Sequence, residues 1–185
     1  MGAGAALAVG GTALLGWRAS AAAPAPSATL DQQIFNFALL LEYLQAAFYS
    51  EAVDAGALRG EIRSFAEVVA DHERQHVAFL EQALGAAARE KPTLDFGSAT
   101  RNQREFLDAA VLLENTGVAA YNGQGANLTK KSLAAAAQIA SVEGRHAAWI
   151  SDLAGRSPAP RAADPGATAA EVEATLRSTG FIKSS

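Results

Sequence analysis

Apolar residues recur every three or four positions along most of this chain, which is the spacing of one face of an α-helix. Turn and capping residues divide the pattern into four long segments and one short one. The predicted helices cover residues 30–54, 61–88, 100–122, 130–153 and 168–178. No segment sustains the period-two alternation that marks a half-buried strand. The sequence therefore predicts an all-α protein.

Helix ends are predicted from two kinds of local pattern. A threonine followed three residues later by glutamine or glutamate favours a helix N-terminus, because both side chains can bond free backbone N–H groups. Three segments fit: Thr29–Gln32, Thr100–Gln103 and Thr168–Glu171. Glycine is favoured just past a helix end. The predicted stops are Gly56, Gly123, Gly125 and Gly155.

Two lone acids interrupt otherwise apolar helix faces. The helix predicted at 30–54 is apolar nearly all round, as expected in the middle of a bundle, and its only central charge is Glu42. Glu114 sits in the same way within the run Val111–Glu114 of the third helix. A buried carboxylate without a partner would protonate rather than stay charged. The alternative for Glu42 is a salt bridge to an arginine, but its own helix contains none.

Two further acids each precede a histidine by three residues. Glu73 and His76 leave one face of the second helix, and Glu143 and His146 repeat the spacing on the fourth. Both pairs fall on apolar stripes that face the core. The chain has no cysteine, so carboxylates and histidines are its only strong metal ligands.

Simple helix geometry predicts that these residues meet. The midpoint between Glu42 and Glu73 falls in the turn at 55–60, so an antiparallel hairpin places both acids at one height. The midpoint between Glu114 and Glu143 falls in the turn at 123–129 in the same way. Pairing the hairpins gathers four carboxylates and two imidazoles, which only a cationic centre makes tolerable. Mostly oxygen ligands with two nitrogens suit iron or manganese better than zinc.

Four segments also carry a family resemblance: IFNFALLLEYLQAAFY, DHERQHVAFL, ENTGVAAYNG and VEGRHAAW. Together they resemble the bacterial and plant ferritin-like-domain family that includes desiccation-related proteins, over residues 30–153. The resemblance implies a four-helix bundle with two Fe or Mn ions at its centre. It implies six metal ligands, of which Glu73 and Glu143 would bridge: Glu42, Glu73, His76, Glu114, Glu143 and His146.

The resemblance further implies a long crossover between the second and third helices. The connection at 89–99, fully extended, reaches ~37 Å, which is enough to run the length of the bundle. The same sequence also fits a plain up-down-up-down bundle. Residues 156–185 form a Pro-rich connection and a short C-terminal helix, with Phe181 and Ile182 expected to dock on the bundle.

A competing motif overlaps the second helix. Residues 72–76 read H-E-x-x-H, the zinc metalloprotease signature, in which His72 would be a ligand and Glu73 a base. That interpretation leaves Glu42, Glu114 and the second Glu-x-x-His pair without a role. The dinuclear interpretation explains all of them and makes His72 an outer or surface residue.

Function is predicted only as a class. Two Fe or Mn ions can act on O2, peroxide or Fe(II), which suggests an oxidative or desiccation stress role. The alternative is a non-catalytic metal-binding or structural stress protein. Several side chains are candidate neighbours of the centre or of its histidines: Tyr43, Tyr49, Tyr121, Arg74, Arg145 and Asp152.

The N-terminal segment indicates where the protein is located, and the charge balance indicates which partners it can have. Residues 1–23 are apolar and end in an Ala-rich A-x-A stretch, so they are interpreted as an export signal or N-terminal anchor, followed by a linker at 24–29. An exported, periplasmic or extracellular protein with no stable span in its mature chain is therefore expected. With 19 acidic and 15 basic residues and no basic run, nucleic acid is excluded as a partner. Oligomers are compatible with the sequence.

Overall fold

A computed structural model describes residues 24–183 of the chain. Its helices are α1 (Ala28–Ala55), α2 (Gly60–Leu84), the 3-10 turn η1 (Gly85–Ala87), α3 (Gln103–Gly125), α4 (Lys130–Leu153) and α5 (Ala169–Thr179). Within the described residues there is no strand, and Leu94 and Ile182 form an isolated antiparallel bridge. The all-α prediction is confirmed. None of these helices is long and apolar enough to cross a membrane.

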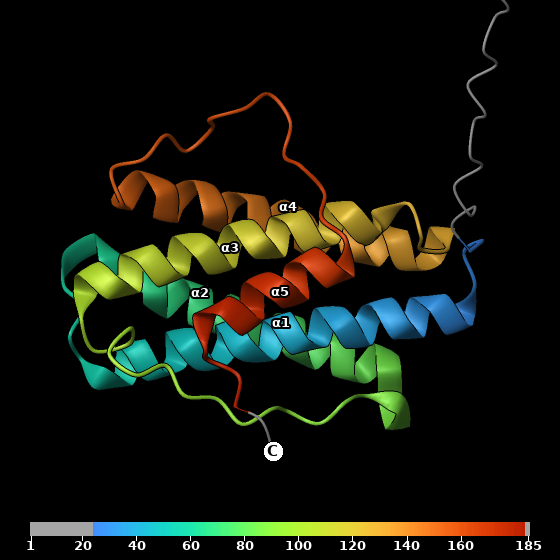
Figure 1. The fold of residues 1–185 in the computed structure, drawn as a ribbon, viewed down its shortest axis with the longest axis horizontal. Coiled ribbons are helices and arrows are strands. Elements are labelled where there is room, and N and C mark those ends of the chain that lie inside the picture. Colours follow the sequence, from blue (N-terminus) through green and yellow to red (C-terminus); the bar gives the residue numbers. More distant parts are fainter. Residues whose placement is uncertain (1–23, 184–185) are drawn as a thin grey trace, which may run out of the picture.

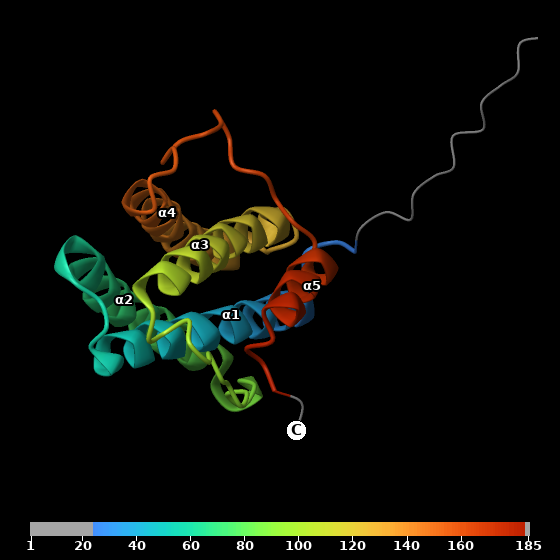
Figure 2. The same ribbon diagram turned by 60° about the vertical axis from the view of Figure 1, so that its left-hand side comes forward.

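The four long helices form a bundle of two antiparallel hairpins. α1 pairs with α2, and α3 pairs with α4 (Figure 1). The connection from η1 to α3 runs back along the whole bundle, so α3 starts at the end where α2 began. Figure 2 shows the same path from a second direction. The crossover prediction is confirmed, and the up-down-up-down alternative is wrong.

Helix ends differ from the prediction at several positions. Ser27 caps α1 by accepting a hydrogen bond from Leu30 N at 3.2 Å, and Asn102 caps α3 with its side-chain oxygen. The capping boxes predicted at Thr29 and Thr100 are therefore wrong, because serine and asparagine nearby are equally strong N-caps. The Thr168 capping box is confirmed.

The glycines predicted to end helices do so at some positions and not at others. Gly56 ends α1 in the left-handed conformation at φ 65°, as expected. α2 ends at Leu84 rather than residue 88, because Gly85 takes φ 55° and the chain tightens into η1. α3 continues through Gly123 and ends at Gly125.

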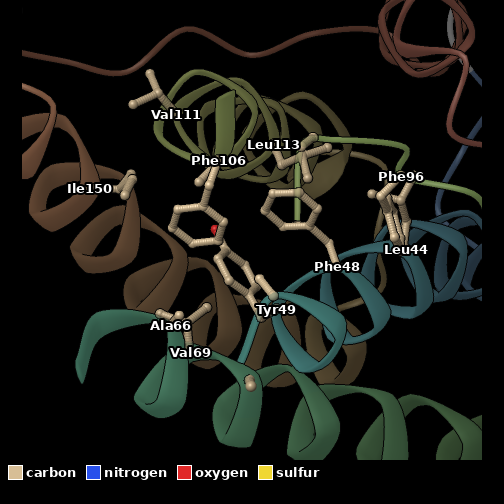
Figure 3. Close-up of a cluster of buried hydrophobic side chains, with 14 of the residues drawn as sticks. Leu44, Phe48, Tyr49, Ala66, Val69, Phe96, Phe106, Val111, Leu113 and Ile150 are labelled. Carbon is tan, nitrogen blue, oxygen red and sulfur yellow. The ribbon is translucent and has the colours of Figure 1, made fainter. Parts of the chain in front are cut away.

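The apolar core lies in two clusters, one toward each end of the bundle. The larger cluster is aromatic: the Phe48 and Phe106 rings stack at 5.3 Å, and Tyr49 meets Phe106 edge-on at 5.9 Å (Figure 3). The smaller cluster surrounds Leu39 and Leu80. Between them the middle of the bundle is left to polar side chains.

The C-terminal segment fastens the crossover to the bundle. Phe181 packs on Phe48 and on Phe96 of the crossover, with ring centroids 6.1 and 5.2 Å apart. Its carbonyl accepts from Asp95 N at 2.9 Å, and Lys183 N donates to the carbonyl of Thr93 at 3.0 Å. The tail therefore supplies backbone partners that the extended crossover would otherwise lack.

One buried acid ties the N-terminus of α1 to that of α4. Asp31 accepts hydrogen bonds from Thr129 N at 2.9 Å, Thr129 Oγ1 at 2.6 Å and Ser132 Oγ at 2.6 Å. Burial by itself would raise the pKa of Asp31, but the hydrogen bonds from Ser132 and Thr129 outweigh it and hold that pKa below its usual value. Asp31 thus acts as a cap supplied from another helix.

Replacing this acid should destabilise the bundle in a pH-dependent way. Asp31→Ala should lower the free energy of unfolding by about 1–2 kcal/mol at pH 7, the usual effect of losing an N-cap. Because the pKa is depressed in the folded state, the stabilisation is present above about pH 4 and lost as the pH falls through the folded pKa. Urea unfolding at pH 7 and pH 3 measures the difference.

Asp152→Asn is the matched control for Asp31→Ala, since Asp152 is exposed on α4. Its effect should stay within about 0.5 kcal/mol at both pH values. A loss for Asp31→Ala that is as large at pH 3 as at pH 7 would show that the carboxylate charge is not what stabilises this contact.

Candidate metal centre

Each of the four long helices brings an acid to the middle of the bundle. α1 supplies one, α2 supplies an acid and a histidine, and α3 and α4 repeat this arrangement. All six side chains are buried: Glu42, Glu73, His76, Glu114, Glu143 and His146. The structure therefore brings together every residue that the sequence pattern selected. Their role as metal ligands stays a prediction.

The six side chains form two overlapping groups whose ligand atoms lie within 4.8 Å of one another. One group, here the Glu42 half, consists of Glu42, His76 and two shared acids. The other, the Glu114 half, consists of Glu114, His146 and the same two acids. The shared acids are Glu73 and Glu143. This is the arrangement that two neighbouring cations with two bridging carboxylates require.

In the Glu42 half, the histidine already bonds to the acids. His76 Nδ1 lies 3.2 Å from Glu42 Oε2 and 3.3 Å from Glu73 Oε2, with hydrogen-bond geometry. Glu143 Oε1 lies at 3.3 Å from the same nitrogen. The imidazole thus offers one donor to three carboxylates.

In the Glu114 half, the atoms face each other without bonding. His146 Nδ1 lies 3.2 Å from Glu73 Oε1 and 3.3 Å from Glu114 Oε2. Three inward atoms of this half are buried without a hydrogen-bond partner: Glu73 Oε1, Glu114 Oε2 and His146 Nδ1. Glu143 Oε1 also lacks one and lies between the two histidines, 3.3 Å from His76 Nδ1 and 3.8 Å from His146 Nδ1. Buried polar atoms are seldom left without a hydrogen-bond partner. Several unpaired atoms that point toward one another are therefore consistent with a cation bound between them.

The electrostatics of the cluster agree with that interpretation. Burial, followed by repulsion from neighbouring acids, raises the pKa of Glu143 to about 8 and that of Glu73 well above its usual value. Burial would lower the pKa of His76, yet the neighbouring carboxylates of Glu143 and Glu42 raise it to about 10. In the metal-free protein, protons bound to Glu73, His76 and Glu143 supply the positive charge that a cation would otherwise supply to the acids.

Two tyrosines bond the terminal acids across the hairpins. Tyr49 of α1 donates to Glu114 Oε1 at 2.6 Å, and Tyr121 of α3 donates to Glu42 Oε1 at 2.5 Å. Each lies seven residues after the acid of its own helix and reaches the acid of the other. Tyr43, the third candidate, was a wrong prediction, because its hydroxyl donates to Glu81 at 2.6 Å instead.

Sequence reasoning missed Gln45 and Gly117. Gln45 is buried, and its Nε2 donates to Glu114 Oε1 at 3.0 Å and Glu143 Oε2 at 3.5 Å. Gly117 occupies the facing turn of α3, where an added Cβ would lie 2.6 Å from Glu143 Oε2. The available signals were their positions, each three residues after the lone acid of its helix.

His72 lies outside both candidate groups and contacts a histidine within one of them. Its Nδ1 is 2.9 Å from His146 Nε2, and the two rings stack with centroids 5.1 Å apart. Burial, then the neighbouring His146 and His76, lower the pKa of His72, which favours the neutral form that can accept a hydrogen bond. The outer role predicted for His72 thus agrees with its geometry, whereas the protease motif would need it among the ligands.

The other predicted outer residues lie elsewhere. Arg74 pairs with Asp71 at 3.2 Å, while Arg145 and Asp152 are exposed. Across residues 24–183, none of the three candidates hydrogen-bonds to His76 or His146. Periodicity cannot predict such partners, because it sets the face of a helix and not the direction of a long side chain.

Fold and site together define a class of protein: four-helix bundles with a central cluster of carboxylates and histidines able to bind metal. The family model described as the ferritin-like domain matches residues 30–156, more than half of the chain. The chain therefore belongs to the ferritin-like domain family. No curated protein matches it.

Adding a methyl group at Gly117 should weaken metal binding without weakening the helix. The new Cβ would meet Glu143 Oε2 and force that carboxylate to move. Gly117→Ala should therefore lower Mn²⁺ affinity at least ~10-fold. Alanine is also favoured over glycine inside a helix by about 1 kcal/mol, which offsets the strain in the metal-free protein. Calorimetric Mn²⁺ titration and urea unfolding measure the two effects.

Gly144→Ala is the matched control, because it follows Glu143 directly in α4 and its added Cβ would meet nothing within 4 Å. It should raise stability by about 1 kcal/mol and leave Mn²⁺ affinity unchanged. Equal Mn²⁺ affinities for the two variants would contradict the steric role assigned to Gly117.

Proposed function

We propose that this protein binds two Fe or Mn ions and uses them on O2, peroxide or Fe(II). The observation that carries the proposal is the pair of overlapping ligand groups that share Glu73 and Glu143. Four carboxylates and two imidazoles balance two divalent cations in charge. The orphaned atoms of the Glu114 half add a reason for cations at this place.

The donor set favours iron or manganese over zinc. Each half offers three acids and one histidine. Structural zinc sites are commonly four-coordinate and rich in thiolate or imidazole, and this chain has no cysteine. Carboxylate-rich sites suit Mn and Fe, and two such ions supply redox chemistry toward O2 and peroxide.

The protein's own groups would hold and enclose the centre. Glu42 and Glu114 would each bind one ion, and the hydroxyls of Tyr121 and Tyr49 keep one oxygen of each acid oriented. Counted over whole residues, His76 is 8% exposed and the other five are at most 3% exposed, so bulk water has little access. A dry, rigid site strengthens charge interactions.

A stress role outside the cytoplasm is part of the proposal. It is supported by the resemblance to desiccation-related proteins and by the Ala-rich sequence of residues 1–23, which lie outside the described residues. The N-terminus of the mature protein, measured by mass spectrometry, should fall near residues 22–24. An intact Met1 on a cytosolic protein would refute export.

The direct test is metal content with turnover. Protein purified without chelator should contain two equivalents of Fe or Mn, and should oxidise Fe(II) in air or consume peroxide. Glu42→Ala and Glu114→Ala should each lose at least one equivalent, because each removes the terminal acid of one half. Glu67→Ala, on an exposed ion pair with Arg63, is the control and should lose none.

The outcomes separate the alternatives. Two equivalents without turnover would favour the non-catalytic metal-binding or structural stress role. One equivalent of zinc with peptidase activity would instead support the H-E-x-x-H interpretation. A protein that binds no metal would overturn the proposal.

Metal binding should also depend on pH. At pH 7 the metal-free centre holds protons, since the pKa of Glu143 is about 8 and those of Glu73 and His76 are raised as well. A cation must displace these protons, so apparent Mn²⁺ affinity should fall as the pH falls from 8 to 6. Titrations with a pH indicator should record proton release at pH 7. An affinity that is constant over this range would contradict the assignment.

A further inference from the structure

The two halves of the centre have the same kinds of ligands but different surroundings. We infer that His72 and Gln45 are positioning residues that make the Glu114 half bind metal more tightly than the Glu42 half. This inference rests on the proposed dinuclear function and deepens it. It follows from comparing each residue of one hairpin with its counterpart in the other.

The first difference concerns the histidines. His146 Nε2 meets His72 Nδ1 at 2.9 Å, so the imidazole of His146 is held with its Nδ1 directed at the acids. The residue before Glu143, where the second hairpin would place its counterpart of His72, is Val142, which has no polar side-chain atom. The side chain of His76 is also more exposed than that of His146, at 11% against 4%. The ring of His146 is therefore held by a histidine from another helix, whereas His76 has no histidine at the corresponding position.

The second difference concerns the terminal acids. Glu114 Oε1 accepts from Tyr49 at 2.6 Å and from Gln45 Nε2 at 3.0 Å. Glu42 Oε1 accepts from Tyr121 at 2.5 Å, and the counterpart of Gln45 in the other hairpin is Gly117, which has no side chain to donate. Counting only donors outside the six candidate ligands, Glu114 is therefore held by two and Glu42 by one.

The third difference is whether the ligand atoms already have hydrogen-bond partners that a cation would displace. Three inward atoms of the Glu114 half have no hydrogen-bond partner: Glu73 Oε1, Glu114 Oε2 and His146 Nδ1. In the Glu42 half, His76 Nδ1 already bonds Glu42 and Glu73, and these contacts must be given up before a cation is bound. A half whose ligands are oriented and unpaired loses less on binding than one that must rearrange.

Outer partners of this kind change metal affinity by about 10–100-fold when they are removed. Calorimetric titration of metal-free wild-type protein with Mn²⁺ should therefore show two steps that differ at least ~10-fold in affinity. At one equivalent, electron paramagnetic resonance should show mainly isolated rather than coupled Mn²⁺. Both readouts report binding and need no turnover.

His72→Ala should weaken the first step about 10–100-fold and bring the two constants together. His72→Asn should restore most of the difference, because its amide oxygen lies near the position of Nδ1 and accepts the same hydrogen bond. Gln45→Leu should weaken the first step as well. Val142→Ala is the matched control from the other hairpin and should change neither step.

Each outcome decides between the inference and the proposed function. Wild-type protein that binds no Mn²⁺ would refute the dinuclear function itself. Two equal constants in the wild type, or an equal effect of His72→Ala on both steps, would overturn the inference while the dinuclear function stands. If His72→Ala does not fold, Gln45→Leu decides, since a first step that this variant leaves unchanged also overturns the inference.

Discussion

The constraint on which the rest of the structure depends is the burial of four carboxylates at one level of a four-helix bundle. Taking a single charged acid out of water is costly, and acids whose oxygens lie within 4.8 Å of each other add mutual repulsion. The chain meets this cost with two histidines, two tyrosines and an amide aimed at the same few oxygens. A layer of this kind destabilises the metal-free fold, so a cation bound there would stabilise the folded state.

Much of the fold and the six central residues could be predicted because they depend on periodicity. Glu42 and Glu73 lie equally far from their turn, and this fixes their common height whatever the side chains around them do. The crossover needed the structure, since a connection long enough to run back along the bundle can also remain at one end. The cap at Ser27 was missed because several neighbouring residues could serve as caps, and tertiary contacts select among them.

Residues around the six were harder to predict, for a different reason. Whether a tyrosine near the centre hydrogen-bonds to one of its acids depends on the direction in which its side chain points from the helix. The hydroxyl of Tyr49 donates to Glu114, whereas that of Tyr43 donates to Glu81. Gln45 looked like one more polar residue, and its role appears only once Glu143 of another helix lies beside it. Helix periodicity carries no information about such cross-hairpin contacts.

Tyr49 links the two demands that this bundle must satisfy. Its ring belongs to the aromatic cluster and lies edge-on to Phe48 at 5.2 Å (Figure 3). It also meets Phe65 edge-on at 5.8 Å, while its hydroxyl donates to Glu114. The ring is held by packing that does not depend on any cation. Phe48 also packs against Phe96 of the crossover and Phe181 of the tail. The crossover and the tail therefore help to fix the ring of Tyr49, whose hydroxyl orients Glu114. The geometry of the polar layer is therefore set from the apolar core, which explains how four repelling acids can be held in place.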